Sequence, residues 1–315
     1  VAAGLAAGLV VWFFLPKVLG KSERPQGSGA GSQVASVGWL SGGTSFSAWP
    51  VWLCLGLFFL LFLKTTFWFY QSWTAGVWQN GHGLFVPIVM VLLGIRALRG
   101  EDWGKTESSP WGLVVVTLAL LLAVVDLRLQ TRYLAAFGFL IGLAGLALTF
   151  LGTRRTRKLI FPIALGVFMV PIPFSVTDQA FLRLATAIPS VEILRLLGFS
   201  VTRMYTVLLF PNFTLDISTA CSGFSTLYAG LFFGVVLAAF SRPRWRQVLV
   251  VAMVLPISLL ANITRAVFLV QLTSLYGTGV LATDVHPASG AATFLMVIAG
   301  LVAVAGRRAL LRVFA

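Results

Sequence analysis

Residues 133–151 read YLAAFGFLIGLAGLALTFL, and a basic cluster of Arg154, Arg155, Arg157 and Lys158 follows soon after. A transmembrane helix needs about 20 predominantly apolar residues, so this run is long enough to cross a bilayer. The whole chain has the same character, since 58% of its 315 residues are hydrophobic and 10% are charged. A water-soluble globule of this length could not bury so much apolar surface. The sequence therefore predicts an all-α polytopic membrane protein.

Similar apolar runs recur along the chain, separated by short breaks that are charged or rich in Gly and Pro. The length rule predicts a bundle of about nine transmembrane helices. Their expected ranges are 1–19, 49–70, 84–98, 111–125, 133–151, 159–174, 222–240, 248–270 and 288–305. We expect residues 1–48 to hold the first helix and a Gly/Ser-rich linker, and residues 49–315 to form one transmembrane domain.

Positive charge follows every second predicted helix. By the positive-inside rule these basic loops face the cytoplasm, which predicts a multi-pass protein of the cytoplasmic (inner) membrane. The net charge of +14 is thus a topology signal, and membrane lipid, not nucleic acid, is the expected surrounding. Five clusters hold most of the 23 Lys and Arg: Lys17, Lys21 and Arg24; Arg96, Arg99 and Lys105; Arg154, Arg155, Arg157 and Lys158; Arg242, Arg244 and Arg246; Arg307, Arg308 and Arg312.

The longest segment expected on the extracytoplasmic side spans residues 175–220, too long for a bare connection. Within it, residues 178–197 carry apolar side chains at helical spacing with charged side chains between them. This pattern is typical of a helix that lies along the membrane interface. Residues 201–217 are rich in Val, Thr, Phe and Tyr, which predicts an extended or hairpin-like piece. This extracytoplasmic interfacial segment leads directly to Cys221.

Four reactive side chains are expected at one membrane depth on the extracytoplasmic side. Cys221 begins the seventh predicted helix, while His82 and His286 precede the third and the ninth. Arg265 lies five residues from the outer end of the eighth, about 8 Å along a helix. An arginine inside the membrane costs about 2.5 to 3.5 kcal/mol at mid-depth, so Arg265 needs a compensating role.

These residue types suit acyl transfer. A thiol at a helix N-terminus beside a cation favours the thiolate, which makes Cys221 a candidate nucleophile. His286 can take the thiol proton and return it to a leaving amine, and Arg265 can stabilise an oxyanion or hold a substrate carboxylate. The residues alone leave the base open between His286 and His82.

Other interpretations remain at this stage. A multi-pass secondary transporter or flippase would explain the helices and the intramembrane arginine, with an incidental cysteine. A serine-type intramembrane protease would use Ser222 instead of Cys221. Cys54 is expected to be an apolar filler. The sequence has no Walker loop and no zinc signature, so no cofactor and no metal are expected.

Five ordered motifs resemble the exosortase/archaeosortase family, over most of the chain. The Phe224-Ser225-Thr226 that follows the cysteine motif departs from the commoner pattern and leaves the subgroup open. The motifs are Gly81-His82-Gly83-Leu84-Phe85-Val86-Pro87, Pro171-Ile172-Pro173, Ala220-Cys221-Ser222-Gly223, Pro256-Ile257 together with Asn262-Ile263-Thr264-Arg265, and His286-Pro287-Ala288-Ser289-Gly290.

The resemblance implies that residues 49–315 form a transmembrane catalytic domain of a cysteine transpeptidase or protease. Its substrates would be exported proteins with a C-terminal sorting signal of the PEP-CTERM kind: a short motif, a transmembrane helix and an Arg-rich tail. A glycan or lipid could serve as the acceptor nucleophile. The proposed triad of that family matches Cys221, Arg265 and His286 here, and accessory positions match His82, Asn262, Ser222 and Gly223.

Two local features carry further expectations. Gly138, Gly142 and Gly145 could receive the substrate's transmembrane helix, although helix packing within the protein is the preferred interpretation. Pro256 is expected to kink the helix that carries Arg265.

Overall fold

The computed structural model describes residues 49–75, 80–102, 108–171, 179–217 and 222–314. The first predicted helix, the Gly/Ser-rich linker and Cys221 therefore lie outside the described residues. The chain divides into two compact units. Unit 1 comprises Val1–Phe67 and Gly94–Ala164, and unit 2 comprises Trp68–Leu93 and Leu165–Ala315.

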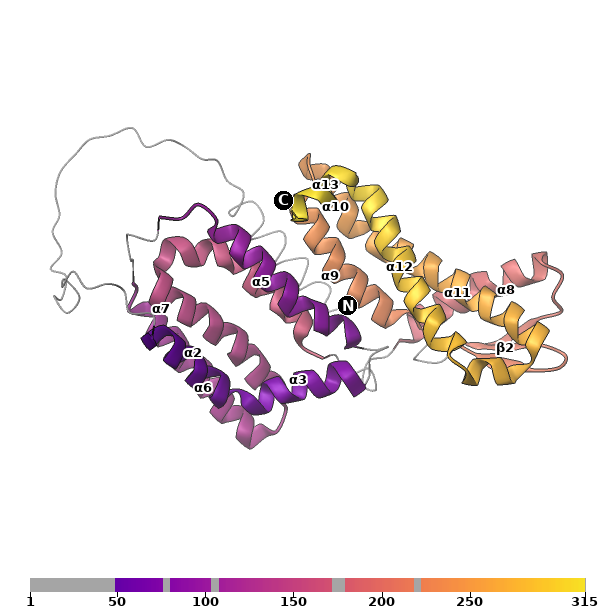
Figure 1. Ribbon diagram of the computed structural model, residues 1–315. Helices are drawn as coiled ribbons and strands as arrows, with labels where there is room; N and C mark the ends of the chain where they lie inside the picture. Colours follow the sequence, from indigo (N-terminus) through magenta and orange to yellow (C-terminus); the bar gives the residue numbers. More distant parts are fainter. Residues whose placement is uncertain (1–48, 76–79, 103–107, 172–178, 218–221, 315) are drawn as a thin grey trace, which may run out of the picture. The chain divides into compact units, whose positions relative to one another are not determined.

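Unit 1 is built from apolar helices that approach one another through glycines and aromatic rings. Its helices are α2 (Trp49–Leu61), the start of α3 (Leu63–Ala75), the end of α5 (Phe85–Leu98), α6 (Trp111–Leu129) and α7 (Tyr133–Leu165) (Figure 1). A side chain at Gly138, Gly142 or Gly145 would meet α6 at Ala119 or Val116. These glycines therefore serve packing within the protein, as the sequence favoured.

The basic loops of unit 1 meet at one end. Glu101, just after α5, forms ion pairs with Lys158 and with Arg155, whose Nε lies 3.6 Å from the carboxylate. Arg155 also donates a hydrogen bond to the carbonyl of Asp102. The loops after the third and fifth predicted helices thus lie on one side, as the charge pattern requires.

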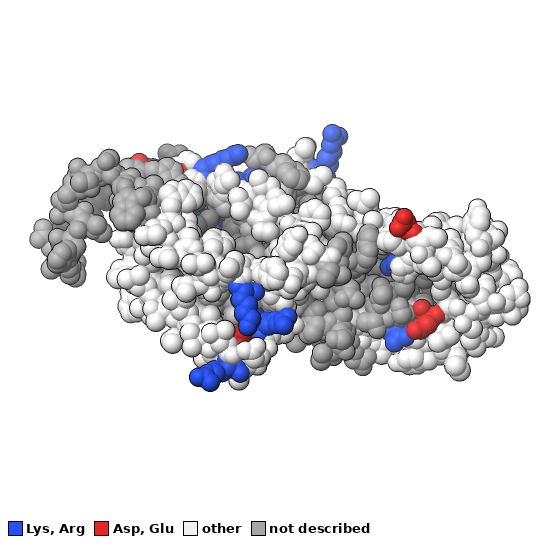
Figure 2. All heavy atoms as spheres, turned by 60° about the horizontal axis from the view of Figure 1, so that its bottom comes forward, with Lys and Arg blue, Asp and Glu red and all other residues white. Residues whose placement is uncertain are grey.

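Large apolar surfaces remain exposed on the helices. In α6 only Gly112, Ala119 and Asp126 are buried, at a spacing of seven residues, whereas Leu113, Leu118, Leu121 and Val124 are exposed. Figure 2 shows a face with few charged side chains, separated by wide uncharged areas. Such surfaces fit contact with lipid.

Unit 2 combines short helices at its ends with three long helices. Two 3₁₀ turns, η1 (Gly81–Leu84) and η2 (Gly166–Met169), precede α8 (Ala180–Leu196). α9 (Phe224–Phe240), α11 (Val254–Tyr276) and α12 (Val285–Ala305) pack side by side (Figure 1). Leu237, Val254, Val297 and Leu301 form the centre of this apolar core. The shorter helices are α10 (Arg244–Ala252), η4 (Thr278–Ala282) and α13 (Arg307–Phe314).

A small antiparallel sheet follows α8. Its strands β1 (Thr202–Met204), β2 (Val207–Leu209) and β3 (Thr214–Asp216) lie in the order β1-β2-β3. Leu208 and Ile217 pack with Leu194 of α8 and Val270 of α11 in a second apolar core. The predicted helix and extended piece are both present, so the described residues form a helical fold with one small sheet.

The nine predicted spans are not confirmed. Among the described residues five helices are long and apolar enough to cross a membrane, or six if α2 and α3, bent by 64° at their junction, count as one. The fifth and sixth predicted spans merge into α7, but Gly152 breaks its helical geometry at φ 71°. α9 has only 17 residues. Near Pro256 the helix is interrupted at Met253, between α10 and α11, because proline cannot donate to the carbonyl of Ala252, but Arg244–Tyr276 still count as one candidate span.

Candidate functional site

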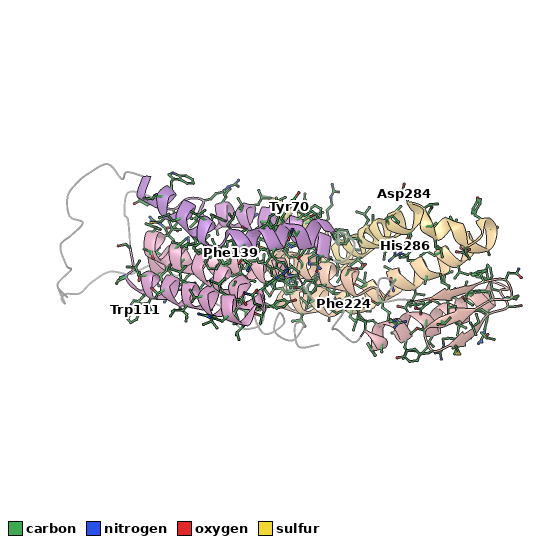
Figure 3. All side chains as sticks on the ribbon, turned by 90° about the horizontal axis from the view of Figure 1, so that it is seen from below. Tyr70, Trp111, Phe139, Phe224, Asp284 and His286 are labelled. Atoms are coloured by element: carbon green, nitrogen blue, oxygen red, sulfur yellow. The ribbon has the colours of Figure 1, made fainter. Side chains whose placement is uncertain are left out.

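Arg265 and His286 meet where α11 packs against α12. One terminal nitrogen of Arg265, Nη2, lies 3.3 Å from His286 Nε2 and donates to the His286 carbonyl, also at 3.3 Å. Arg265 Nε donates to Ser289 Oγ at 3.0 Å, and Ser289 in turn donates to the carbonyl of His286 at 2.7 Å. Ser289, absent from the expected site, thus fixes both partners. Figure 3 shows His286 and Asp284 at the same end of α12.

The contact between Arg265 and His286 determines the form of the imidazole. A guanidinium carries only N–H donors, so Nε2 must be the acceptor of this hydrogen bond. The ring is then neutral, with its proton on Nδ1. Nε2 can act as a base once the guanidinium turns to another acceptor.

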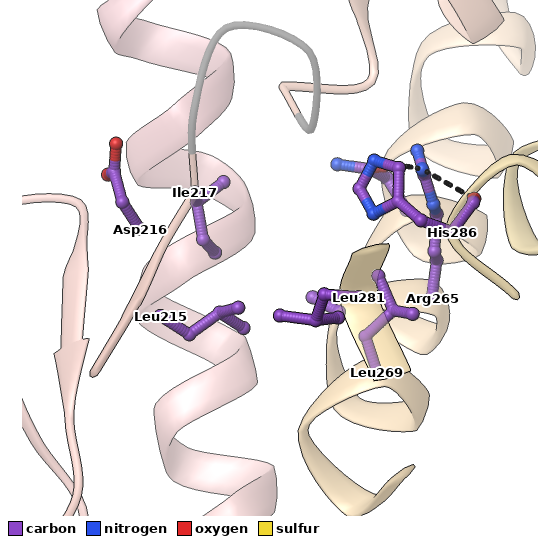
Figure 4. A pocket seen from close by; sticks show the side chains of 9 residues that line it. Leu215, Asp216, Ile217, Arg265, Leu269, Leu281 and His286 are labelled. Carbon is purple, nitrogen blue, oxygen red and sulfur yellow. Dashed lines mark hydrogen bonds between the residues drawn. The ribbon is translucent and has the colours of Figure 1, made fainter. Parts of the chain in front are cut away.

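A groove of about 230 Å³ opens beside these residues. Its floor is one stripe of α11: Asn262, Arg265, Ala266 and Leu269. One wall is Leu215, Asp216 and Ile217 at the end of the sheet, and the other wall is Leu281 of η4 and His286. Figure 4 shows Leu215 and Ile217 on one side of the pocket, with Leu281 and His286 opposite them. One end of the groove is polar and the other is apolar.

The start of α9 is held by a buried polar network. Ser222 donates a hydrogen bond to Gln179 Oε1, and both side chains are buried. Gly223 has φ +77°, and a Cβ atom there would come within 2.8 Å of the Asn262 side chain. Asn262 donates to Thr186 Oγ1 at 3.0 Å. Three of the expected accessory residues, Asn262, Ser222 and Gly223, therefore meet here.

Sequence reasoning missed Gln179 and Thr186. Both are buried, and both contribute an oxygen that accepts a hydrogen bond from a motif residue. The only signal was their spacing of seven residues, which places them on the same face of one helix.

His82 does not line the groove. Its ring packs edge-on against Tyr228 with centroids 4.9 Å apart, and its side chain is buried. The neighbouring Gly83 faces the ring of Trp73, whose Nε1 donates to the Met169 carbonyl at 2.9 Å. The Gly-His-Gly motif thus lies in η1, which packs against η2, whereas His286 lines the groove.

Cys221 lies outside the described residues, and of the two segments beside it the preceding one lines the groove. Ile217 is part of its wall, and Gly223 contacts Asn262 on its floor.

Comparison with known proteins supports the family suggested by the motifs. The family model described as transmembrane exosortase (Exosortase_EpsH) matches residues 73–303, more than half of the chain. No curated protein and no solved structure gave a match. The matched segment includes His82, Cys221, Arg265 and His286. The chain therefore belongs to the transmembrane exosortase family.

Proposed function

We propose that this exosortase is a cysteine transpeptidase or protease that cleaves C-terminal sorting signals of exported proteins through a thioester on Cys221. The observation that carries the proposal is the contact between Arg265 and His286 in a groove that is also lined by Ile217. Cys221 is the fourth residue after Ile217 and the second before Gly223, whose backbone lies against the side chain of Asn262, another residue of the groove. The resemblance supplies the class of substrate, with its short motif, transmembrane helix and Arg-rich tail.

The reaction would proceed in two steps, formation of the thioester and its resolution. The carbonyl oxygen of the substrate takes the hydrogen bond of Arg265, which frees His286 Nε2 to accept the thiol proton. The sulfur attacks the carbonyl carbon, a C–S bond forms, the C–N bond breaks, and His286 returns the proton to the leaving amine. A second nucleophile, either water or a hydroxyl of a glycan or lipid acceptor, then gives its proton to His286 and attacks the thioester carbon; a C–O bond forms, the C–S bond breaks, and the sulfur takes the proton from His286.

The charge pattern of unit 2 supports an extracytoplasmic site. The basic residues after α9 and α12 lie at one end of these helices, where Arg312 Nη1 contacts the Phe240 carbonyl at 3.5 Å. His286 is at the opposite end of α12 (Figure 3). If the basic end faces the cytoplasm of a bacterial-type inner membrane, the groove opens on the other side.

Substitution of each cysteine tests the proposal. A secreted reporter fused to a tripartite C-terminal tail from the same genome is co-expressed, and its processing is measured by a shift in mass. Cys221→Ala and Cys221→Ser should abolish processing without loss of membrane insertion, while Cys54→Ala should process normally. Arg265→Lys should also fail, because lysine lacks the planar fork that reaches both Ser289 and His286.

Unimpaired processing by Cys221→Ala would overturn the enzyme proposal. The Ser222 alternative is disfavoured by the buried hydrogen bond from its hydroxyl to Gln179. A transporter would show substrate uptake that does not depend on the thiol.

A further inference from the structure

β3 is an edge strand among the described residues, and its last residue borders the groove. The backbone N–H of Ile217 donates to the Thr206 carbonyl, and the N–H of Phe210 donates to the Phe213 carbonyl. Bonded and non-bonded pairs alternate along an antiparallel ladder, so Leu215 is bonded to Leu208. The peptide groups of Thr214 and Asp216 therefore point away from β2.

The sheet is firmly anchored beside the groove. Arg183 of α8 donates to the Ile217 carbonyl, to Thr206 and, at 3.1 Å, to the Asp216 carboxylate. Leu208 and Ile217 are buried in the core that includes α8 and α11. A preformed, rigid edge lowers the entropy lost when a peptide pairs with it.

We infer that an extended stretch of the substrate polypeptide binds in this groove as a fourth strand along β3, an inference that rests on the proposed function. An edge strand offers hydrogen bonds to an incoming main chain, and pockets beside it select alternate side chains. The groove has both features, because β3 forms its edge and apolar side chains line the space beside it. Its floor is a single stripe of α11, and the wall opposite β3 is formed by Leu281 and His286.

The polar and apolar ends of the groove also determine which substrate side chain is preferred near the scissile bond. Arg265 and Leu269 are four residues apart on α11, or about 6 Å along the helix axis. An extended chain advances about 3.4 Å per residue, and every second side chain points the same way. A substrate with its scissile carbonyl at Arg265 thus places the side chain two residues away among Leu215, Leu269 and Leu281. That side chain should be apolar.

Processing of the tripartite reporter tests the inference with two matched pairs of variants. Asp216→Pro removes an outward N–H without removing a bond of the sheet, and proline is tolerated on edge strands. Asp216→Ala is its control, because it loses the carboxylate but keeps the N–H. Ala266→Phe fills the groove floor, and Leu275→Phe adds bulk to an exposed position of the same helix.

Ala266→Phe should lower the processing rate by about ten-fold or more while Leu275→Phe stays near the unmodified protein, and Asp216→Pro should be slower than Asp216→Ala by a similar factor. Alkylation of Cys221 by iodoacetamide in a Cys54→Ala background should remain in all variants, which separates loss of substrate binding from loss of the site. If Asp216→Pro disrupts the sheet, the processing rate of Ala266→Phe alone tests the inference.

Normal processing by Asp216→Pro and Ala266→Phe, with an inactive Cys221→Ala, would overturn strand docking and leave the proposed function standing. Normal processing by Cys221→Ala would overturn both.

Discussion

The interiors of the two units differ in how their helices are held together. Around Gly138, Gly142 and Gly145, unit 1 packs α6 and α7 through glycines, together with the rings of Phe58, Phe62 and Phe139. Unit 2 buries hydrogen-bonded side chains between α8, α9 and α11, among them Gln179, Thr186, Ser222 and Asn262. Buried polar groups are costly unless they are paired. Their concentration at the start of α9 therefore marks the part of the molecule that needs a fixed geometry, whereas unit 1 needs only close packing.

The largest expected effect comes from Gly223→Ala, which tests how tightly the start of α9 is fixed. The variant combines a left-handed backbone with overlap of its Cβ and Asn262, so we expect a loss of about 2–4 kcal/mol in unfolding free energy. Unfolding in detergent measures it.

Gly198→Ala provides the control for Gly223→Ala. Gly198 has φ +88°, and a Cβ atom added there would have nothing within 4 Å, so only the backbone strain of about 1–2 kcal/mol should remain. Equal losses for the two variants would contradict a fixed contact between Gly223 and Asn262.

A smaller effect is expected from Thr186→Val, which sharpens the comparison at the polar network itself. Valine keeps the volume but removes the acceptor for Asn262, at a cost of about 1–3 kcal/mol in stability and with slower alkylation of Cys221. Thr186→Ser keeps the hydroxyl and should alkylate at the normal rate. The polar network would have no positioning role if the two variants alkylated equally fast.

The smallest effect is expected in unit 1, where the charged contacts lie at the loop end. The hydrogen bond from Lys158, with the positive charge nearby, lowers the pKa of the Glu101 carboxyl. Its contribution to stability is complete above the pKa of the unfolded chain and is lost as pH falls through the lowered folded value. Glu101→Gln should remove this acid-dependent step in the unfolding midpoint while processing continues. An unchanged acid profile would show that the pair does not stabilise unit 1.

The membrane class, the helix over residues 180–196 and the extended piece before Cys221 could be predicted from the sequence, because each depends on a local pattern. The number of spans could not be predicted, since apolar run length does not reveal the bend between α2 and α3 or the break at Gly152. The position of a residue along a predicted helix indicates its depth in the membrane, but it does not indicate which other helices lie beside it. His82 was therefore grouped with His286, although it packs against Tyr228.

The meeting of Arg265 with His286 followed from topology and motif order, whereas their hydrogen bonds and the link through Ser289 required the packing of α11 on α12. Gln179 and Thr186 could not be recognised because polar residues on an interfacial helix normally face water. Their buried roles come from the hydrogen bonds of Gln179 with Ser222, before α9, and of Thr186 with Asn262 of α11.

Interception of the intermediate tests the central claim most directly. Hydroxylamine is added to membranes that process the tripartite reporter, and the new C-terminus of the reporter is identified by mass spectrometry. A thioester on Cys221 predicts a hydroxamate at that terminus, formed only when Cys221 is present. A terminus that stays a free carboxylate at every hydroxylamine concentration, or a hydroxamate that persists in Cys221→Ala, would contradict the account.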